Sequence, residues 1–195
     1  MSEAKKKVAP STKMLRMIDV LNSPWAIIPE KLVEIREIYF RHLRGEEIDL
    51  SAIEAQLGRR LNNEQRRIEV MDGVAVLAVQ GVVAKRMNLF TEISGGTSTQ
   101  LLAQDFQAAL DDPTVHSILL DIDSPGGDVD GTLEMARLIR EARGRKPILA
   151  LGDGTMASAA YWIGSAADRV FITGETTQVG SIGVVATHID ISRAR

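Results

Sequence analysis

The stretch HSILLDIDSPGG (residues 116–127) decides the fold of this chain. Its first part, His116–Ile122, is a short apolar run with the length of a buried strand, and the turn Asp123–Gly127 follows directly. Leu133–Ala142 then repeats apolar residues at helical spacing, and Ile148–Leu151 has the pattern of another buried strand. A strand followed by a helix and a second strand predicts a layered α/β fold with a central, mainly parallel sheet.

The same alternation extends in both directions. Toward the N-terminus, Ile68–Met71 and Val74–Val79 flank Asp72-Gly73, which is a strong hairpin signal. Gly95-Gly96 is expected to open a loop, and Thr99 is expected to cap a helix. Toward the C-terminus we expect a loop, a helix and two strands, at Gly152–Met156, Ala157–Ala167, Arg169–Thr173 and Ile182–Ala186.

The region before Ile68 is charge-rich and has helical periodicity. Pro29 suits the first turn of a helix and Gly45 suits its end. One apolar stripe lies between them, formed by Leu32, Ile35, Tyr39, His42 and Leu43. A capping box at Ser51 and Glu54 predicts a second, short helix. We therefore expect a flexible basic tail at 1–13, a helical segment at 14–67 and an α/β domain at 68–195.

Composition limits the classes of function. The chain has 195 residues, 45% of them hydrophobic, and a formal net charge of −3, which argue for a folded globular protein and against a nucleic-acid binder. It has no cysteine, which excludes disulfides, thiolate metal sites and a cysteine nucleophile. Lys13, Arg16 and Asp19 interrupt the apolar stretch that a signal peptide needs, and no apolar run reaches membrane-spanning length, so we expect neither.

Two loops contain residues of the kinds found in catalytic or anion-binding sites. The first is the turn Asp123–Gly127. Pro125 fixes one dihedral, while Gly126 and Gly127 permit backbone conformations that other residues avoid, so this turn can aim backbone N–H groups at an anion. We expect the turn to stand just before a helix N-terminus, which favours negative charge. The alternative is a tight strand-to-helix turn with no ligand.

The second loop precedes Ser158. Ser158 follows a Gly-containing loop and begins a helix, a placement that exposes a hydroxyl and lets the next backbone N–H stabilise an oxyanion. Its small neighbours, Ala157, Ala159 and Ala160, leave room for a substrate carbonyl. The alternative is a helix-capping serine on a close-packed, alanine-rich helix.

Four blocks, taken in order, resemble a known family. They are VAVLAVQGVV (74–83), ILLDIDSPGGDV (118–129), GTMASAAYWIGSAADRVF (154–171) and TTQVGSIGVVATHIDIS (176–192). The chain resembles the serine peptidases that include signal peptide peptidase A and the protein C-type head proteases of tailed phages, which have the ClpP/crotonase-like fold. The segment MIDVLNSPWAIIPEKL (17–32) is similar to the leader of the phage-type branch. With no signal peptide, the phage or prophage branch is favoured.

The resemblance implies a serine endopeptidase. Ser158 would be the nucleophile, the backbone N–H groups of Gly127 and Ala159 would hold the oxyanion, and Gly126 would permit close approach. The family's base is a neutral lysine that would fall beyond Arg195, so we expect this chain to be a fragment. By resemblance it would be a homo-oligomeric head maturation protease. It would cleave a scaffold or portal-associated protein in the host cytoplasm or phage head, without a cofactor, metal, nucleic acid or membrane span.

The sequence also permits other interpretations of the base and the function. A ClpP-like Ser158–His188 pair, oriented by Asp190, would supply a base within this chain, since His titrates near neutrality. Lys85 is a further candidate base. An inactive relative would serve only in capsid assembly. A crotonase-type hydratase or isomerase shares the fold but uses carboxylates, and the Ser158 helix contains no Glu. Asp121, Asp123 and Asp128 cluster near the glycine turn, as metal ligands can, but the three histidines, at 42, 116 and 188, have no metal-site spacing among them. Asp128 is expected to begin a helix.

Overall fold

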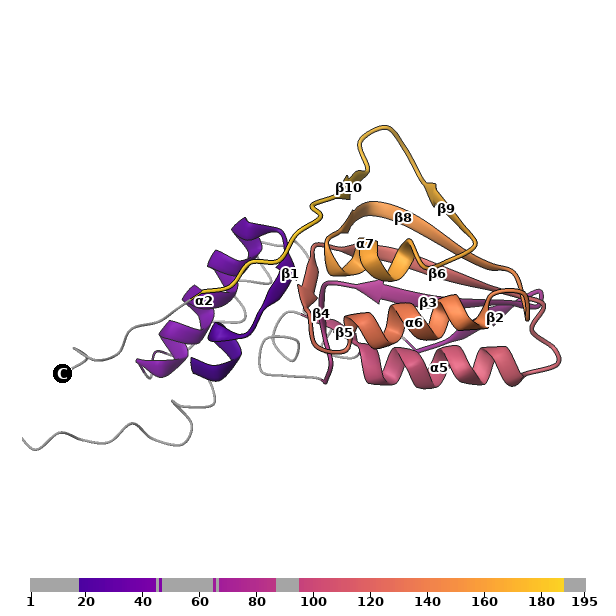
Figure 1. The fold of residues 1–195 in the computed structure, drawn as a ribbon, viewed down its shortest axis with the longest axis horizontal. Helices are drawn as coiled ribbons and strands as arrows, with labels where there is room; N and C mark the ends of the chain where they lie inside the picture. Colours follow the sequence, from indigo (N-terminus) through magenta and orange to yellow (C-terminus); the bar gives the residue numbers. More distant parts are fainter. Residues whose placement is uncertain (1–17, 45, 47–64, 66, 87–94, 188–195) are drawn as a thin grey trace, which may run out of the picture.

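A computed structural model describes residues 18–44, 46, 65, 67–86 and 95–187 (Figure 1). The larger sheet of this described part runs in the order β10-β8-β6-β3-β2, with β9 also pairing with β8. All of its pairings are parallel except the one between β2 and β3. The predicted α/β class with a mainly parallel central sheet is therefore confirmed. The strands are β2 (Glu69–Met71), β3 (Val74–Gln80), β6 (Ser117–Ser124), β8 (Ile148–Ala157), β9 (Arg169–Ile172) and β10 (Gln178–Gly180).

The predicted hairpin between β2 and β3 is present. Asp72 and Gly73 both have positive φ, 50° and 79°, which the tight two-residue turn requires. The turn also packs tightly: a Cβ on Gly73 would stand 2.7 Å from the His116 ring. The sequence predicted this hairpin correctly because Asp and Gly both belong to the small group of residues that tolerate a left-handed backbone.

Three helices flank the larger sheet: α5 (Thr99–Asp111), α6 (Thr132–Ala142) and α7 (Ala159–Gly164). Figure 1 shows α5 and α6 lying side by side along the sheet, with α7 next to β8. The main core joins fully buried side chains of the sheet to the inward helix faces, including Leu77, Phe106, Ile118, Leu120, Met135 and Ile139. Ser98, rather than the predicted Thr99, caps α5, because Ser98 keeps an extended backbone while its Oγ accepts from Leu101 N at 3.4 Å.

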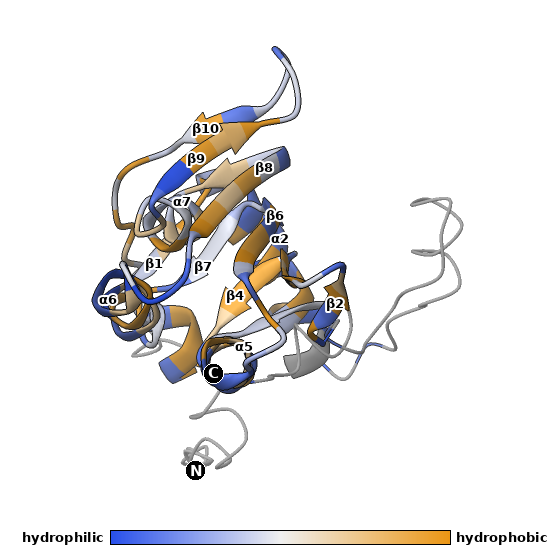
Figure 2. Cartoon of the chain, turned by 90° about the vertical axis from the view of Figure 1, so that its right-hand side faces the viewer, coloured by the Kyte–Doolittle hydropathy of each residue, from blue (hydrophilic) through white to orange (hydrophobic). Residues whose placement is uncertain are grey.

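A smaller sheet has the order β1-β7-β4-β5. It contains β1 (Trp25–Ile27), β7 (Gly126–Asp128), β4 (Val82–Ala84) and β5 (Gly96–Ser98). The hydropathy colours of Figure 2 show β4 as a hydrophobic strand, and all three of its residues are buried. β1 lies inside the segment expected to be helical, so that prediction missed a strand. Three residues are too few for a periodicity that would predict a strand, and pairing with the distant strand β7 stabilises β1.

α2 (Pro29–Leu43) begins at the predicted proline. The stripe residues Leu32, Ile35 and Tyr39 are buried, as expected. They join Leu21, Trp25, Ile27 and Val82 in a second core, separate from the main one. Figure 1 shows α2 and β1 beside the α/β body. The predicted tail at 1–13 and the helix predicted after Ser51 lie outside the described residues.

Several C-terminal boundaries differ from expectation. β8 continues through the predicted loop to Ala157, with a register shift against β6 after Ile122. α7 is shorter than the predicted helix. The strand expected at Ile182–Ala186 is replaced by β10, while Val185 forms an isolated bridge with Trp25. Alanine and glycine are both depleted in strands, so the local sequence gives little strand signal here and long-range pairing sets these boundaries. No helix within the described ranges combines the length and hydropathy of a membrane span.

Candidate active site

Ser158 stands at the turn between β8 and α7, as the sequence predicts, and its backbone is strained. Its φ and ψ are 52° and −113°, a region that residues with a Cβ rarely occupy. The side chain makes no capping hydrogen bond to α7, so the alternative of a helix-capping serine is wrong. Ser158 is 6% exposed, so its hydroxyl is more buried than expected. A strained serine at a strand-to-helix turn is the arrangement of a nucleophile elbow.

The block after β9 packs directly against this serine. Ser158 N donates to the Gly180 carbonyl oxygen at 2.7 Å, and Ser158 Oγ donates to the Gly183 carbonyl oxygen at 3.3 Å. Trp162 N donates back to Ser158 O at 2.8 Å and begins the α7 ladder. The long Oγ bond leaves the hydroxyl weakly held, so it can turn toward a ligand.

The glycine turn lies against the other side of Ser158. A Cβ on Gly126 would stand 3.1 Å from both Ala157 O and Ala159 N. A Cβ on Gly127 would overlap the backbone of Val83 in β4. Residues from all four sequence blocks therefore meet around one serine, which no single motif could establish.

One expectation about the glycine turn is wrong. Gly126 and Gly127 belong to β7 and do not stand at a helix N-terminus, because α6 begins only at Thr132. The helix whose N-terminus adjoins this site is α7, and Ala159 is its first residue. Ala159 N–H is thus the donor that follows the candidate nucleophile, as the resemblance implies.

An apolar pocket of about 380 Å³ opens beside Ser158. Tyr161 and Trp162 form part of its wall. Among its described lining residues there is no Asp, Glu, His or Lys, so the pocket suits an uncharged side chain. Its lining residues are Ala26, Ser158, Tyr161, Trp162, Ser165, Ile182, Gly183 and Val184.

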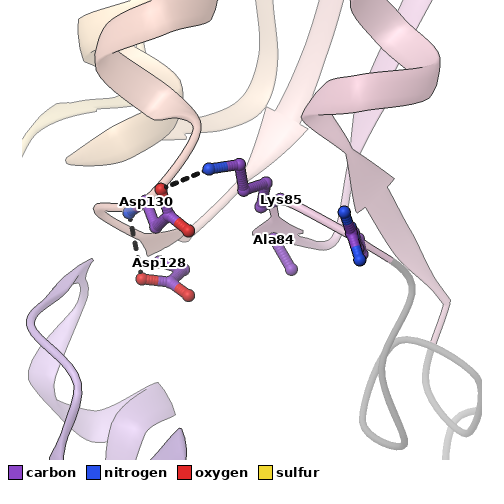
Figure 3. A pocket seen from close by; sticks show the side chains of 5 residues that line it. Ala84, Lys85, Asp128 and Asp130 are labelled. Atoms are coloured by element: carbon purple, nitrogen blue, oxygen red, sulfur yellow. Dashed lines mark hydrogen bonds and ion pairs between the residues drawn. The ribbon is translucent and has the colours of Figure 1, made fainter.

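Lys85 does not line the Ser158 pocket. Its Nζ bonds Asp130 Oδ1 at 2.8 Å beside a different hollow (Figure 3). The hydrogen bond to Asp130 and that carboxylate's charge raise the pKa of Lys85, which keeps the amine protonated. A protonated lysine cannot accept the serine proton, so Lys85 is not the base. His188 and Asp190, the other candidates, lie outside the described residues.

Asp128 lies in β7 and does not begin a helix, which corrects the sequence-based expectation. Its Oδ1 accepts from Asp130 N at 3.1 Å (Figure 3). Burial raises the pKa of the Asp128 carboxyl, and the Asp130 N–H only partly offsets this effect. Burying the charged form therefore costs stability at neutral pH.

We expect Asp128→Asn to be more stable than the parent at pH 7. A carboxyl with a raised folded-state pKa contributes stability below its unfolded pKa of about 4 and loses it as the pH rises. The amide oxygen of Asn keeps an acceptor for Asp130 N, so the advantage should shrink below about pH 4. Urea unfolding at both pH values checks this. An equal loss of stability at both pH values would contradict it.

A buried, strained serine followed by the first N–H of a helix, beside a close-packed glycine strand, is the arrangement found in sites of the serine hydrolase type. Among serine hydrolases, the known proteins that this chain resembles are peptidases. Residues 140–195 match the family model "Peptidase family S49". The chain is 38% identical over 131 residues to "Capsid assembly protease C" of Escherichia phage lambda, covering 67% of this chain and 30% of that protein.

A second relative is the "Head-tail preconnector protein GP5" of Enterobacteria phage P21. It is 39% identical over 124 residues, covering 64% of this chain and 25% of that protein. The resemblance carried by the four blocks is confirmed: the chain is similar in sequence to S49 serine peptidases. It spans about a third or less of the length of these two phage proteins.

Solved structures with a similar chain path include an enoyl-CoA hydratase from Mycobacterium smegmatis. It is 18% identical, with a TM-score of 0.40, and covers 69% of this chain and 51% of that one. An enoyl-CoA hydratase/isomerase family member, 20% identical with a TM-score of 0.40, covers 54% of this chain and 46% of that one.

Proposed function

We propose that this chain carries the nucleophile and oxyanion hole of a serine endopeptidase. The observation that carries the proposal is the strained backbone of Ser158, which stands where the glycine strand and the first N–H of α7 converge. Such a conformation costs of order 1–3 kcal/mol, and strain of this kind clusters at functional sites. The kinship with S49 peptidases supports the same role.

The chemistry follows from these groups. Ser158 Oγ adds to the peptide carbonyl carbon while a base takes its proton, and the N–H groups of Gly127 and Ala159 stabilise the oxyanion. The C–N bond then breaks, the amine leaves with that proton, and water hydrolyses the acyl ester to restore the serine. We propose a neutral lysine beyond Arg195 as the base. The alternative base is His188.

The phage relatives support a proposal for the substrate. One is named a capsid assembly protease and the other a head-tail preconnector protein. We therefore propose that the substrate is a phage scaffold or portal-associated protein, cleaved in the host cytoplasm or within the phage head. The apolar pocket beside Ser158 would accept a small or apolar side chain next to the scissile bond.

Self-association is part of the proposal. The edge formed by β9, β10 and the following residues exposes large apolar side chains, and Figure 2 shows the hydrophobic residues of β9 there. Apolar side chains gathered at a sheet edge favour contact with a second copy. The exposed residues are Val170, Phe171, Ile172, Val179, Ile182 and Val184.

The direct test mixes the full-length protein with the scaffold protein from the same phage or prophage. We expect discrete fragments from the parent and none from Ser158→Ala, with both proteins equally folded by circular dichroism. An uncut scaffold, with the parent and Ser158→Ala behaving identically, would contradict the peptidase and favour a silent assembly component.

A further inference from the structure

β1 is hydrogen-bonded along both of its edges. On one edge, Trp25 exchanges two bonds of 2.8 Å with Val185, from N to O and from O to N. On the other edge it pairs antiparallel with β7, and bonds from Ile28 N to Pro125 O (3.0 Å) and from Val129 N to Pro24 O (3.2 Å) flank the pair. An extended segment thus fills a slot between two stretches of chain, as a bound peptide would.

The register places one β1 carbonyl in the candidate oxyanion hole. Hydrogen-bonded pairs alternate along an antiparallel ladder, so the two flanking bonds make Ala26 and Gly127 a hydrogen-bonded pair. Gly127 N–H therefore donates to the Ala26 carbonyl oxygen. The Cβ that Gly126 lacks would overlap that same oxygen and lie 3.1 Å from Ala159 N.

Ala26 also lines the pocket that contains Ser158. Its carbonyl oxygen therefore takes the Gly127 N–H assigned to the oxyanion, within the pocket that contains the candidate nucleophile. A substrate carbonyl cannot accept from Gly127 N–H while Ala26 occupies that position.

The packing of β1 allows it to separate from β7. Its side chains pack with α2 in the second core, which is separate from the main core and takes only Val82 as a buried member from the α/β body. Figure 1 shows β1 and α2 beside that body. β1 can therefore separate from β7 without exposing the main core.

We propose that β1 is a built-in pseudosubstrate strap, which blocks the site until it is displaced from β7. This inference rests on the proposed function. The strand that replaces β1 is an extended peptide running antiparallel to β7, and the residue whose carbonyl is attacked takes the place of Ala26. The resting protein is therefore self-inhibited, and its activity depends on release of the N-terminal segment.

A reversible lock tests the strap. Pro24 is exposed, Val129 is half-buried, and the two are paired across β1 and β7. The Cα separation of about 5.5 Å in such a pair suits a disulfide. The full-length Pro24→Cys/Val129→Cys protein is treated with a fluorophosphonate, which labels activated serines. We expect labelling of Ser158 to fall at least tenfold on oxidation and to recover on reduction, while the parent is indifferent to reductant.

A loosened strap should act in the opposite direction. Trp25→Ala removes the largest anchor of β1 and is expected to speed labelling several-fold, with circular dichroism confirming the fold. Equal labelling of the oxidised and reduced lock would overturn the strap, and so would slower labelling of a folded Trp25→Ala. If the double-cysteine variant is unlabelled both when oxidised and when reduced, while the parent is labelled, the labelling rate of Trp25→Ala decides whether β1 blocks the site.

A readout without catalysis separates the strap from the proposed function. Hydrogen exchange over residues 18–28 should be much faster than over β6, because β1 opens while the main core stays closed. Exchange as slow as that of β6 would make β1 a permanent strand and refute the strap. Fast exchange with no labelling of any variant would instead refute the nucleophile.

Discussion

Ser158→Ala is expected to abolish peptide-bond cleavage by the full-length protein, with a fall in kcat of about 10⁴-fold or more. The loss follows because the nucleophilic oxygen disappears, while the pocket and the N–H donors remain. The fold should survive, because alanine occupies the same backbone conformation and only the long bond to Gly183 O is lost. Cleavage kinetics beside a circular dichroism melt measure both effects.

Ser165→Ala is the matched control for this loss. Ser165 lines the same pocket, and within the described part of the chain its Oγ donates to Trp162 O at 3.0 Å, so it belongs to the pocket wall but supplies no group to the bond-breaking step. We expect its kcat to stay within a few-fold of the parent. If Ser158→Ala kept the activity of the parent, or if both variants fell equally, the nucleophile would have to be sought elsewhere.

Gly127→Ala is expected to have the largest effect on stability. The added Cβ would overlap the O, C and N atoms of Val83, so β7 and β4 must separate for it to fit. Because the obstacle is backbone rather than a flexible side chain, relief requires breaking the smaller sheet. We expect a loss above about 4 kcal/mol in the free energy of unfolding, which is exceptional for one substitution.

Gly174→Ala is the control for Gly127→Ala. A Cβ on Gly174 meets nothing within 4 Å and its φ is not in the left-handed region, so its free energy of unfolding should change by less than about 0.5 kcal/mol. Urea unfolding of the two variants against the parent gives the comparison. If Gly127→Ala unfolded at the same urea concentration as Gly174→Ala, β4 and β7 could not be as close as described.

The sequence predicted those elements whose signals are local. A short stretch of sequence is enough to predict the turn at Asp72 and Gly73, whose φ values are both positive. The same holds for the long apolar run of β6. The position of Ser158 between a strand and a helix was predicted in the same way. The sequence could not show that Lys85, one further candidate base, is engaged elsewhere, because its ion pair with Asp130 joins residues 45 positions apart.

The smaller sheet could not be predicted from local pattern. β1, β4, β5 and β7 have three residues each, too few for any periodicity, and they exist because distant segments pair. The sequence analysis expected the two glycines of β7 in a turn, because the close approach of Val83 cannot be predicted from the residues around them. The strap inference comes entirely from this sheet.

An activated nucleophile at Ser158 should react with a covalent serine probe. The full-length protein is treated with a fluorophosphonate under conditions that release the N-terminal strand, digested, and mapped by mass spectrometry. The account predicts a single phosphonyl adduct, on the peptide that contains Ser158, which is absent from Ser158→Ala. An adduct on a different serine, or none on a folded protein whose β1 is shown to be open, would contradict it.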